Sequence, residues 1–236
     1  MSSWQESFDI VNPSWMENWY DQLQDLTIRS SYFRMSQQEF ETVWRLIDGL
    51  GGLAPSFYDK ATACMQDLKG DKFFFRLGSR SPKDNCVEVK NGADINFCMS
   101  DSMRVMEDLL LCEKVEYLPY VFLREWKDIP QKYEFRCFVK DGELKGITQY
   151  FYDQNLQYLH DKDTREDIVK KAEKLLAKIL PRIELQNFIF DIAYQGVFEP
   201  ALLIEINPFS SWTDPCLFDW ATEDWSEFKF KYVNEL

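Results

Sequence analysis

Apolar residues recur at helical spacing in several stretches of the chain. In the first of them, Ser36 and Glu39 have the spacing of a capping box, in which each side chain satisfies a free backbone N–H at a helix start. The apolar positions that follow are Phe40, Val43, Trp44 and Ile47. Because they repeat every three to four residues and stop at the glycine-rich segment 49–52, they predict an amphipathic helix.

Four further stretches have helical character. They cover about 56–68, 99–115, 163–180 and 219–228. We expect the helix over 99–115 to begin at Ser100 or Asp101, and the helix over 163–180 to be capped by Asp163 or Thr164. The acidic stretch 219–228 is interpreted as a solvated helix anchored by its aromatic residues.

Alternating apolar and polar positions predict strands elsewhere. The clearest case is a hairpin over 134–152, where Phe135, Cys137 and Val139 take alternate positions before a turn at 140–143. Shorter apolar strands are predicted over 72–77, 120–126, 187–195 and 200–209. Because helices and strands are mixed and hairpins pair antiparallel, we expect an α+β fold with an antiparallel sheet in its C-terminal half. We expect two lobes, 1–123 and 124–236.

Composition narrows the classes of function. The 236 residues carry 40 acidic and 27 basic side chains, a net charge of −13, which argues against general binding of nucleic acids or anionic membranes. His160 is the single histidine, which excludes multi-histidine metal sites, and we assign it no catalytic role. Six cysteines without a CxxC pair, no apparent export signal and no apolar run near 18 residues predict a reduced, cytoplasmic protein.

Three oxygen-bearing side chains gather in the last two predicted strands. Asp191 lies in one strand, and Glu205 and Asn207 share a face of the next. A short hairpin can bring the three together, and such oxygen ligands suit a hard cation such as Mg²⁺. The alternative is that these residues are the solvated face of an ordinary antiparallel sheet.

A basic loop follows the strand 72–77. Arg76, Arg80 and Lys83 could neutralise phosphate oxygens, and Ser81 adds a hydroxyl donor in a segment where Gly78 permits close backbone approach. The alternative is a solvent-exposed polar turn.

A third set of charged residues surrounds the expected lobe boundary. Arg124, Glu125 and Trp126 end the strand 120–126, while Glu134 and Arg136 share the face of the hairpin that points away from the presumed core. For Arg136 the alternative is a cross-strand ion pair, which contributes little at a surface. For Trp126 it is core packing.

Taken together, these segments resemble the cell division cycle protein 123 family, a divergent branch of the ATP-grasp proteins. The resemblance rests on five segments of the chain, which are SWMENWYDQLQDLTIRS, RLGSRSPKD, FLREW, EFRCFVKDGELKGITQ and FIFDIAY with LIEINPFSSWTDPCLFDW. It implies two α+β lobes with ATP bound between them. Departures from the family pattern are Arg76 for lysine, Gly78-Ser79-Arg80 for Asn-Trp-Ser, Tyr150 for arginine and Glu205 for aspartate.

The resemblance also implies roles for individual residues. Asp191, Glu205 and Asn207 would hold Mg²⁺ on the nucleotide, and Arg136 would face its phosphates. Arg76, Ser81 and Lys83 would belong to the phosphate-binding segment, and Arg124, Glu125 and Trp126 would border the adenine. By resemblance, the function is ATP-dependent assembly of translation initiation factor two through its gamma subunit. The alternative is an ATP-grasp ligase that activates a carboxylate or other acid by phosphorylation.

Overall fold

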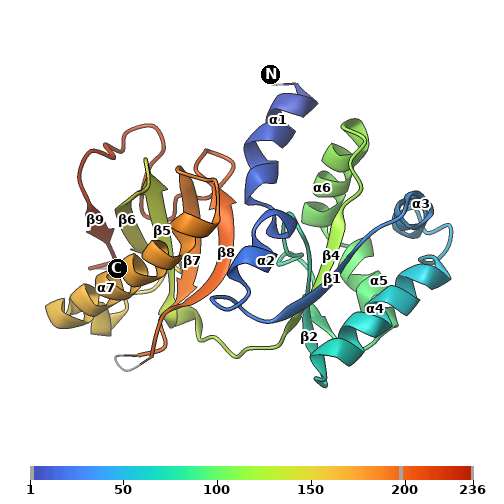
Figure 1. Cartoon of the computed structure of the whole chain (residues 1–236), viewed down its shortest axis with the longest axis horizontal. Coiled ribbons are helices and arrows are strands. Elements are labelled where there is room, and N and C mark those ends of the chain that lie inside the picture. The colour runs from blue at the N-terminus through green and yellow to red at the C-terminus, as the bar shows by residue number, and fades with distance from the viewer. Residues whose placement is uncertain (1–2, 197–198, 235–236) are drawn as a thin grey trace. The chain divides into compact units, whose positions relative to one another are not determined.

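A computed structural model describes residues 3–196 and 199–234 and contains two compact units (Figure 1). Unit 1 comprises Met1–Glu17 and Arg29–Lys127, and unit 2 comprises Asn18–Ile28 and Asp128–Leu236. Each unit combines helices with one sheet, which confirms the α+β class. The division into lobes at residue 123 stays a prediction. The contacts divide the chain after Lys127 and assign the early segment 18–28 to unit 2.

Unit 1 is built on a four-stranded antiparallel sheet. Its strands, in the spatial order β1-β4-β2-β3, are β1 (Ser30–Arg34), β4 (Tyr120–Glu125), β2 (Phe73–Leu77) and β3 (Glu88–Val89). Its helices are α1 (Trp4–Val11), η1 (Asn12–Ser14), α3 (Gln37–Ile47), α4 (Pro55–Leu68), α5 (Gly92–Ser100) and α6 (Met103–Lys114). Alternate strand residues such as Phe75 and Leu123 join Phe57 of α4 in one apolar core. This core lies on one face of the sheet, so the other face is left for polar and aromatic side chains.

Local signals explain where the helices of unit 1 begin. Glu39 N–H donates to Ser36 Oγ at 3.3 Å and Ser36 N–H donates to the Glu39 carboxylate at 2.7 Å, so the predicted capping box is confirmed. The helix predicted over 99–115 is confirmed as α6, but its cap is Ser102 instead of Ser100 or Asp101, and the separate helix α5 before it was not predicted. Ser102 caps α6, and its hydroxyl donates to Asp84 at 2.6 Å.

Unit 2 is built on a five-stranded sheet. The strands, in the order β8-β7-β5-β6-β9, are β8 (Leu202–Pro208), β7 (Phe188–Ala193), β5 (Glu134–Lys140), β6 (Glu143–Gln149) and β9 (Lys229–Lys231). All neighbours pair antiparallel except β6 and β9, which are parallel. The predicted hairpin is confirmed, and its turn residues Asp141 and Gly142 have φ of 54° and 75°, as a tight two-residue hairpin turn requires. The remaining helical elements are η2 (Met16–Asn18), which crosses the unit boundary, and, within unit 2, α2 (Tyr20–Leu23), η3 (Gln131–Tyr133), η4 (Gln157–His160), α7 (Lys162–Ile179) and η5 (Leu180–Arg182).

The two faces of this sheet have different covers. Helix α7 crosses one face (Figure 1) and buries Ile168, Ala172 and Leu175, while its N-cap is Asp161 instead of the predicted Asp163 or Thr164. The opposite face carries the aromatic cluster, defined as Phe138, Ile189, Phe209, Phe218, Trp220 and Trp225. The helix predicted over 219–228 is wrong. These residues form turns up to the start of β9, and their tryptophans pack against the sheet.

The segment 18–28 is attached to unit 2 at strand β8. Leu203 N–H donates to the carbonyl of Leu26 at 2.9 Å, and Thr27 Oγ1 donates to the carbonyl of Leu203 at 2.8 Å. Trp19 and Leu23 of the same segment are buried. An early piece of the chain therefore completes the unit formed by the last hundred residues.

Candidate functional site

A row of polar side chains crosses the whole sheet of unit 2. Directly paired strand positions place five residues side by side, in the order Glu205, Asp191, Arg136, Thr148 and Lys231. We call this set the charged row. Because paired positions of neighbouring strands point to the same face, all five side chains lie on the face that also bears the aromatic cluster. As the alternation predicts, Asp191 and Glu205 are direct neighbours.

Arg136 and Asp191 form a buried bidentate ion pair at the centre of the charged row. The distances are 2.9 Å from Nε to Oδ1 and 2.7 Å from Nη2 to Oδ2, and the side chains are 4% and 1% exposed. The Nη1 of Arg136 donates to the carbonyl of Asp214 at 2.5 Å, and the guanidinium lies 4.7 Å from the ring centre of Tyr150. The predicted alternative of a cross-strand pair is therefore confirmed in its geometry, but the pair is buried instead of lying at the surface.

The surroundings of Arg136 fix its charge. Burial lowers the pKa of Arg136, but the Asp191 carboxylate more than compensates, and the net shift is upward. The guanidinium is thus a permanent cation at this position. Burial raises the pKa of the neighbouring Cys216 thiol to about 12, although Arg136 opposes that shift, so this cysteine is not an activated thiolate.

Glu205 and Asn207 complete the oxygen-rich end of the charged row. Glu205 is 9% exposed, and Asn207 Nδ2 donates to Asp191 Oδ2 at 3.2 Å. Carboxylate and amide oxygens are the donors that Mg²⁺ prefers, so the residue types fit such an ion. Both oxygens of Asp191 accept hydrogen bonds from Arg136, however, so the edge of the carboxylate that faces Arg136 becomes available to a cation only when that pair opens. Among the described residues, no group of three or more His, Cys, Asp or Glu side chains is arranged to hold a metal.

In unit 1, Arg76 and Arg124 lie on the sheet face opposite the apolar core. Arg76 pairs with Phe122 and Arg124 with Phe74, and both arginines are nearly buried, at 3% and 2% exposed. The Nε of Arg76 donates to the carbonyl of Leu77 at 3.0 Å, and its Nη2 donates to the carbonyl of Ser79 at 3.1 Å. Arg76 therefore braces the start of the basic loop.

The basic loop, residues 78–85, is tied to helix α6. Arg80 Nε donates to Asp108 Oδ1 at 2.8 Å, and Ser79 Oγ donates to Asp108 Oδ2 at 2.5 Å. Ser81 is buried and its carbonyl accepts a hydrogen bond from Arg104 Nε at 3.0 Å, whereas Lys83 is exposed. Arg80 thus has a structural ion pair, while Lys83 remains accessible at the surface.

Gly78 and Glu17 lie in contact at the beginning of this loop. A Cβ atom built on Gly78 would lie 1.8 Å from a carboxylate oxygen of Glu17, so any larger residue there would displace that carboxylate. The other oxygen of Glu17 accepts a hydrogen bond from the Tyr117 hydroxyl at 2.8 Å. Burial raises the pKa of Glu17, against the lowering effects of its hydrogen bonds and of Arg76 and Arg34.

Glu125 and Trp126 end strand β4 at the edge of unit 1. Glu125 lies 3.6 Å from Arg29 and 3.8 Å from Lys127, at ion-pair distances. The Trp126 ring lies 6.4 Å from that of Phe74, and the Lys72 ammonium lies 4.1 Å above the indole. Trp126 is thus part of a half-buried cation and aromatic group, outside the main core.

Residues named from the sequence therefore gather into two sets, one in each unit. Unit 2 brings together Arg136, Asp191, Glu205 and Asn207. Sequence reasoning missed Thr148 and Lys231 as members of the charged row, and Lys72 beside Trp126. The alternation of the hairpin could have indicated Thr148, but the parallel pairing of Lys231 with Thr148 has no local signal.

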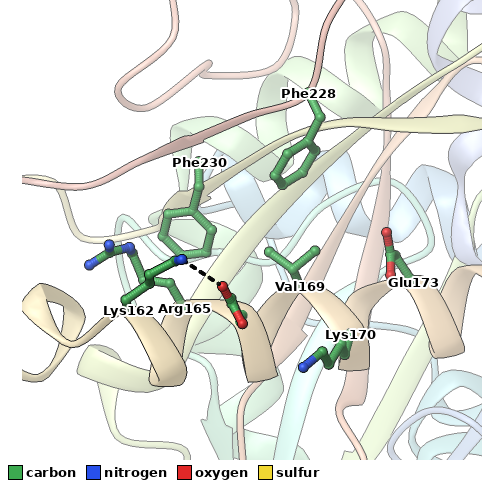
Figure 2. Close-up of a pocket in the computed structure, with 8 residues that line it drawn as sticks. Lys162, Arg165, Val169, Lys170, Glu173, Phe228 and Phe230 are labelled. Atoms are coloured by element: carbon green, nitrogen blue, oxygen red, sulfur yellow. Dashed lines mark ion pairs between the residues drawn. The ribbon is translucent and has the colours of Figure 1, made fainter.

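A separate hollow of about 390 Å³ lies on the other side of unit 2, between helix α7 and the strand β9 region. Figure 2 shows Phe228 and Phe230 pointing toward α7, where Lys162 and Glu166 form an ion pair at 3.4 Å. Phe230 belongs to the opposite sheet face from Lys231, so this hollow is distinct from the charged row. It contains none of the residues predicted from the sequence.

Two other observations concern the chain as a whole. All six cysteines are free thiols. Within 3–196 and 199–234, no helix combines the length and the apolar character needed to cross a membrane.

Comparison with solved structures defines the class of fold. Cdc123 from Schizosaccharomyces pombe matches with a TM-score of 0.79 at 20% identity, over 94% of this chain and 96% of that one. The fold is thus that of a Cdc123-type protein. Residues 55–234 match the D123 family, and the chain belongs to this family. The resemblance inferred from the sequence motifs is confirmed.

Two curated relatives have related sequences. The translation initiation factor eIF2 assembly protein of Candida albicans is 30% identical over 187 residues, which are 69% of this chain and 52% of that protein. The protein of the same name from Vanderwaltozyma polyspora is 40% identical over 104 residues, which are 42% of this chain and 26% of that protein. The chain therefore spans about half the length, or less, of these curated relatives.

Proposed function

We propose that this protein binds ATP together with Mg²⁺. The observation that carries the proposal is the charged row, in which an arginine and two carboxylates are held nearly without solvent on one sheet face. Buried charges are costly to keep, and clusters of them are candidates for functional sites. The motif resemblance to ATP-grasp proteins suggests ATP as the ligand of this cluster.

In this proposal each unit contributes residues of a different kind. Unit 2 offers Asp191, Glu205 and Asn207 as oxygen donors to the cation, and Arg136 as a fixed positive charge for phosphate. Unit 1 offers its nucleotide-binding residues Arg76, Ser81, Lys83, Arg124, Glu125 and Trp126. The half-buried Trp126 supplies an apolar surface of the kind that borders a base, and Lys83 is an exposed cation. Bound Mg²⁺ would neutralise phosphate charge.

Calorimetric titration with ATP and MgCl₂ tests this function. We expect the wild type to bind and Asn207→Ala to bind at least about tenfold more weakly, a loss equivalent to roughly 1.4 kcal/mol. Glu184→Gln, which changes an exposed carboxylate outside the charged row, is the matched control and should bind like the wild type. Absence of binding by folded wild type at millimolar MgATP would refute the proposal.

We further propose that the protein takes part in assembly of translation initiation factor two in the cytoplasm, through the gamma subunit. The names of the relatives and membership of the D123 family support this role. The net charge of −13 suits docking on a basic protein surface. Purified gamma subunit should bind the wild type, with weaker binding for Asn207→Ala if nucleotide is required. No complex at micromolar concentrations would contradict the role.

A turnover assay separates this role from that of a ligase. ATP is incubated with the protein and small-molecule extract, and ADP, AMP and phosphate are measured. Release that depends on a small molecule and disappears in Asn207→Ala would favour the ligase. Complex formation with the gamma subunit without such release would favour assembly.

A further inference from the structure

The ion pair of Arg136 and Asp191 holds both residues away from the roles that nucleotide binding requires. Both oxygens of Asp191 accept hydrogen bonds from Arg136, and the Nη1 of Arg136 donates to the Asp214 carbonyl. The pair must therefore open before Arg136 can turn its Nε–Nη2 edge to a phosphate, or Asp191 can turn the facing edge of its carboxylate to a cation. The side chains are 4% and 1% exposed, so water is poorly placed to replace either partner.

Opening the pair on one side alone is unfavourable. A phosphate that takes Arg136 leaves the buried Asp191 carboxylate with its Asn207 hydrogen bond but without its cationic partner. A cation that takes Asp191 leaves the buried guanidinium with the Asp214 carbonyl but without its anionic partner. Removing one partner of a buried pair has a much larger cost than exchanging both. When an anion and a cation arrive together, each buried charge receives a new partner of opposite sign.

We propose that Arg136 is a positioning residue that masks Asp191 until a nucleotide phosphate displaces it, so that metal and nucleotide bind with strong positive coupling. This inference rests on the proposed ATP and Mg²⁺ site. Asn207 supports it, since its amide donates to Asp191 Oδ2 and keeps the carboxylate in place while Arg136 is bound. Thermodynamic linkage makes the coupling reciprocal, so the metal also promotes release of Arg136 to the phosphate.

Substitution of Arg136 should therefore cause a gain in metal binding, not a simple loss of function. In the absence of nucleotide, removal of Arg136 should increase metal affinity, because Asp191 becomes available. Mn²⁺ is the probe, titrated into nucleotide-free protein and followed by the electron paramagnetic resonance signal of the free ion. We expect Arg136→Gln to bind Mn²⁺ about tenfold or more tightly than the wild type, within the usual range of coupling between sites.

Two variants control for trivial explanations. Lys174→Gln removes a positive charge from the exposed surface of α7 and so makes the same change in net charge. It should bind Mn²⁺ like the wild type. Arg136→Gln combined with Asp191→Asn should lose the gain, which would identify Asp191 as the unmasked ligand. A merely structural role for Arg136 predicts equal or weaker Mn²⁺ binding.

Folding is checked by circular dichroism and thermal unfolding. If Arg136→Gln does not fold, Arg136→Lys takes its place, because lysine keeps the charge but cannot make the bidentate contact. It should bind Mn²⁺ more tightly than the wild type, by a smaller factor. Folded Arg136→Gln, or Arg136→Lys in its place, without any gain overturns the masking role.

The outcomes separate this inference from the proposed function. The Mn²⁺ arm contains no nucleotide, so it reports on the mask alone. A gain in Mn²⁺ affinity in a protein that never binds ATP would support the mask and refute nucleotide binding. ATP binding by the wild type without a Mn²⁺ gain in Arg136→Gln would refute the mask and leave nucleotide binding intact.

Discussion

Two arginine–aspartate pairs, one from each unit, differ in how they are built. Arg136 and Asp191 face each other from adjacent strands, with side chains 4% and 1% exposed. Arg80 and Asp108 join the basic loop to helix α6, with side chains 36% and 9% exposed. The first pair is fixed by strand register in the interior of unit 2, and the second ties a loop to a helix near solvent.

This difference shows how one chemical pairing serves two purposes. Near solvent, an arginine that loses its partner can be hydrated, so the pair mainly holds loop 78–85 in place. In the interior, water cannot readily replace either partner of the ion pair. The pair therefore stays closed unless another ion takes the place of one partner. The same two residue types thus give a structural tie in unit 1 and a candidate ligand switch in unit 2.

The largest expected effect comes from breaking the buried pair. Asp191→Ala leaves Arg136 buried without its counter-ion and should lower the free energy of unfolding by about 3–5 kcal/mol. Urea unfolding followed by tryptophan fluorescence measures this loss. Replacing both partners with apolar residues, Arg136→Met with Asp191→Leu, should recover part of it. A loss no greater than that from Asp108→Ala would remove the contrast between the pairs.

A substitution at Gly146, beside the charged row, tests how tightly the aromatic cluster packs on that face of the sheet. A Cβ atom on Gly146 would lie 2.7 Å from the Phe218 ring and 3.3 Å from Trp225. Gly146→Ala should therefore push the aromatic cluster outward and lower the free energy of unfolding by about 1–3 kcal/mol. Gly51→Ala, whose added atom would meet only the flexible end of Arg45 at 3.7 Å, is the control. Equal stability of the two variants would show that the cluster is loosely packed.

Breaking the less buried pair, Arg80 and Asp108, should have a smaller effect. Asp108→Ala removes the acceptor of Ser79 and Arg80 and should lower the free energy of unfolding by about 1–2 kcal/mol, with a decreasing effect at high salt. Glu107→Gln changes the other, exposed partner of Arg80 and should have almost no effect. A loss from Asp108→Ala that is independent of salt would mean that this pair is as well shielded as the pair in unit 2.

Glu17 extends the comparison to a carboxylate that accepts from a tyrosine instead of an arginine. Because burial raises its folded pKa above the ordinary 4.5, the folded state binds the proton more tightly than the unfolded chain. Wild-type stability should therefore fall as pH rises from 4.5 through the raised folded pKa. Glu17→Gln lacks this dependence and should gain on the wild type across that window, by about 1 kcal/mol or less.

Unfolding midpoints at pH 4 and pH 7 measure this effect, with the exposed Glu41→Gln as control. A parallel pH profile for Glu17→Gln and the wild type would show that Glu17 does not titrate abnormally.

Features set by nearby residues could be predicted from the sequence. The capping box of α3 needs only Ser36 and Glu39, and the β5–β6 hairpin needs only its alternation and the Asp141-Gly142 turn. The juxtaposition of Asp191 and Glu205 also follows from alternation across one hairpin. The functional roles of these residues stay predictions.

Features set by distant residues could not be predicted in this way. Ser102, the N-cap of α6, donates to Asp84, which lies 18 residues earlier, so the start of this helix depends in part on a distant residue. Trp225 packs beside Gly146, which lies in the distant strand β6. A helical pattern within 219–228 says nothing about the energy of this packing. Arg136 could be assigned to a cross-strand pair, but its contact with the carbonyl of Asp214, which comes 78 residues later, could not be predicted.

The attachment of Asn18–Ile28 to strand β8 has a consequence for biosynthesis. Its contact with Leu203 joins positions 176 residues apart, so the strand to which this segment is attached is absent until most of the chain has been made. Trp19, Leu23 and Leu26 of this segment are buried in the finished protein, in which β8 is present. Contacts of such long separation form slowly. We therefore expect that nascent chains ending before β8 expose this apolar segment to chaperones and proteases, although unit 1 is complete.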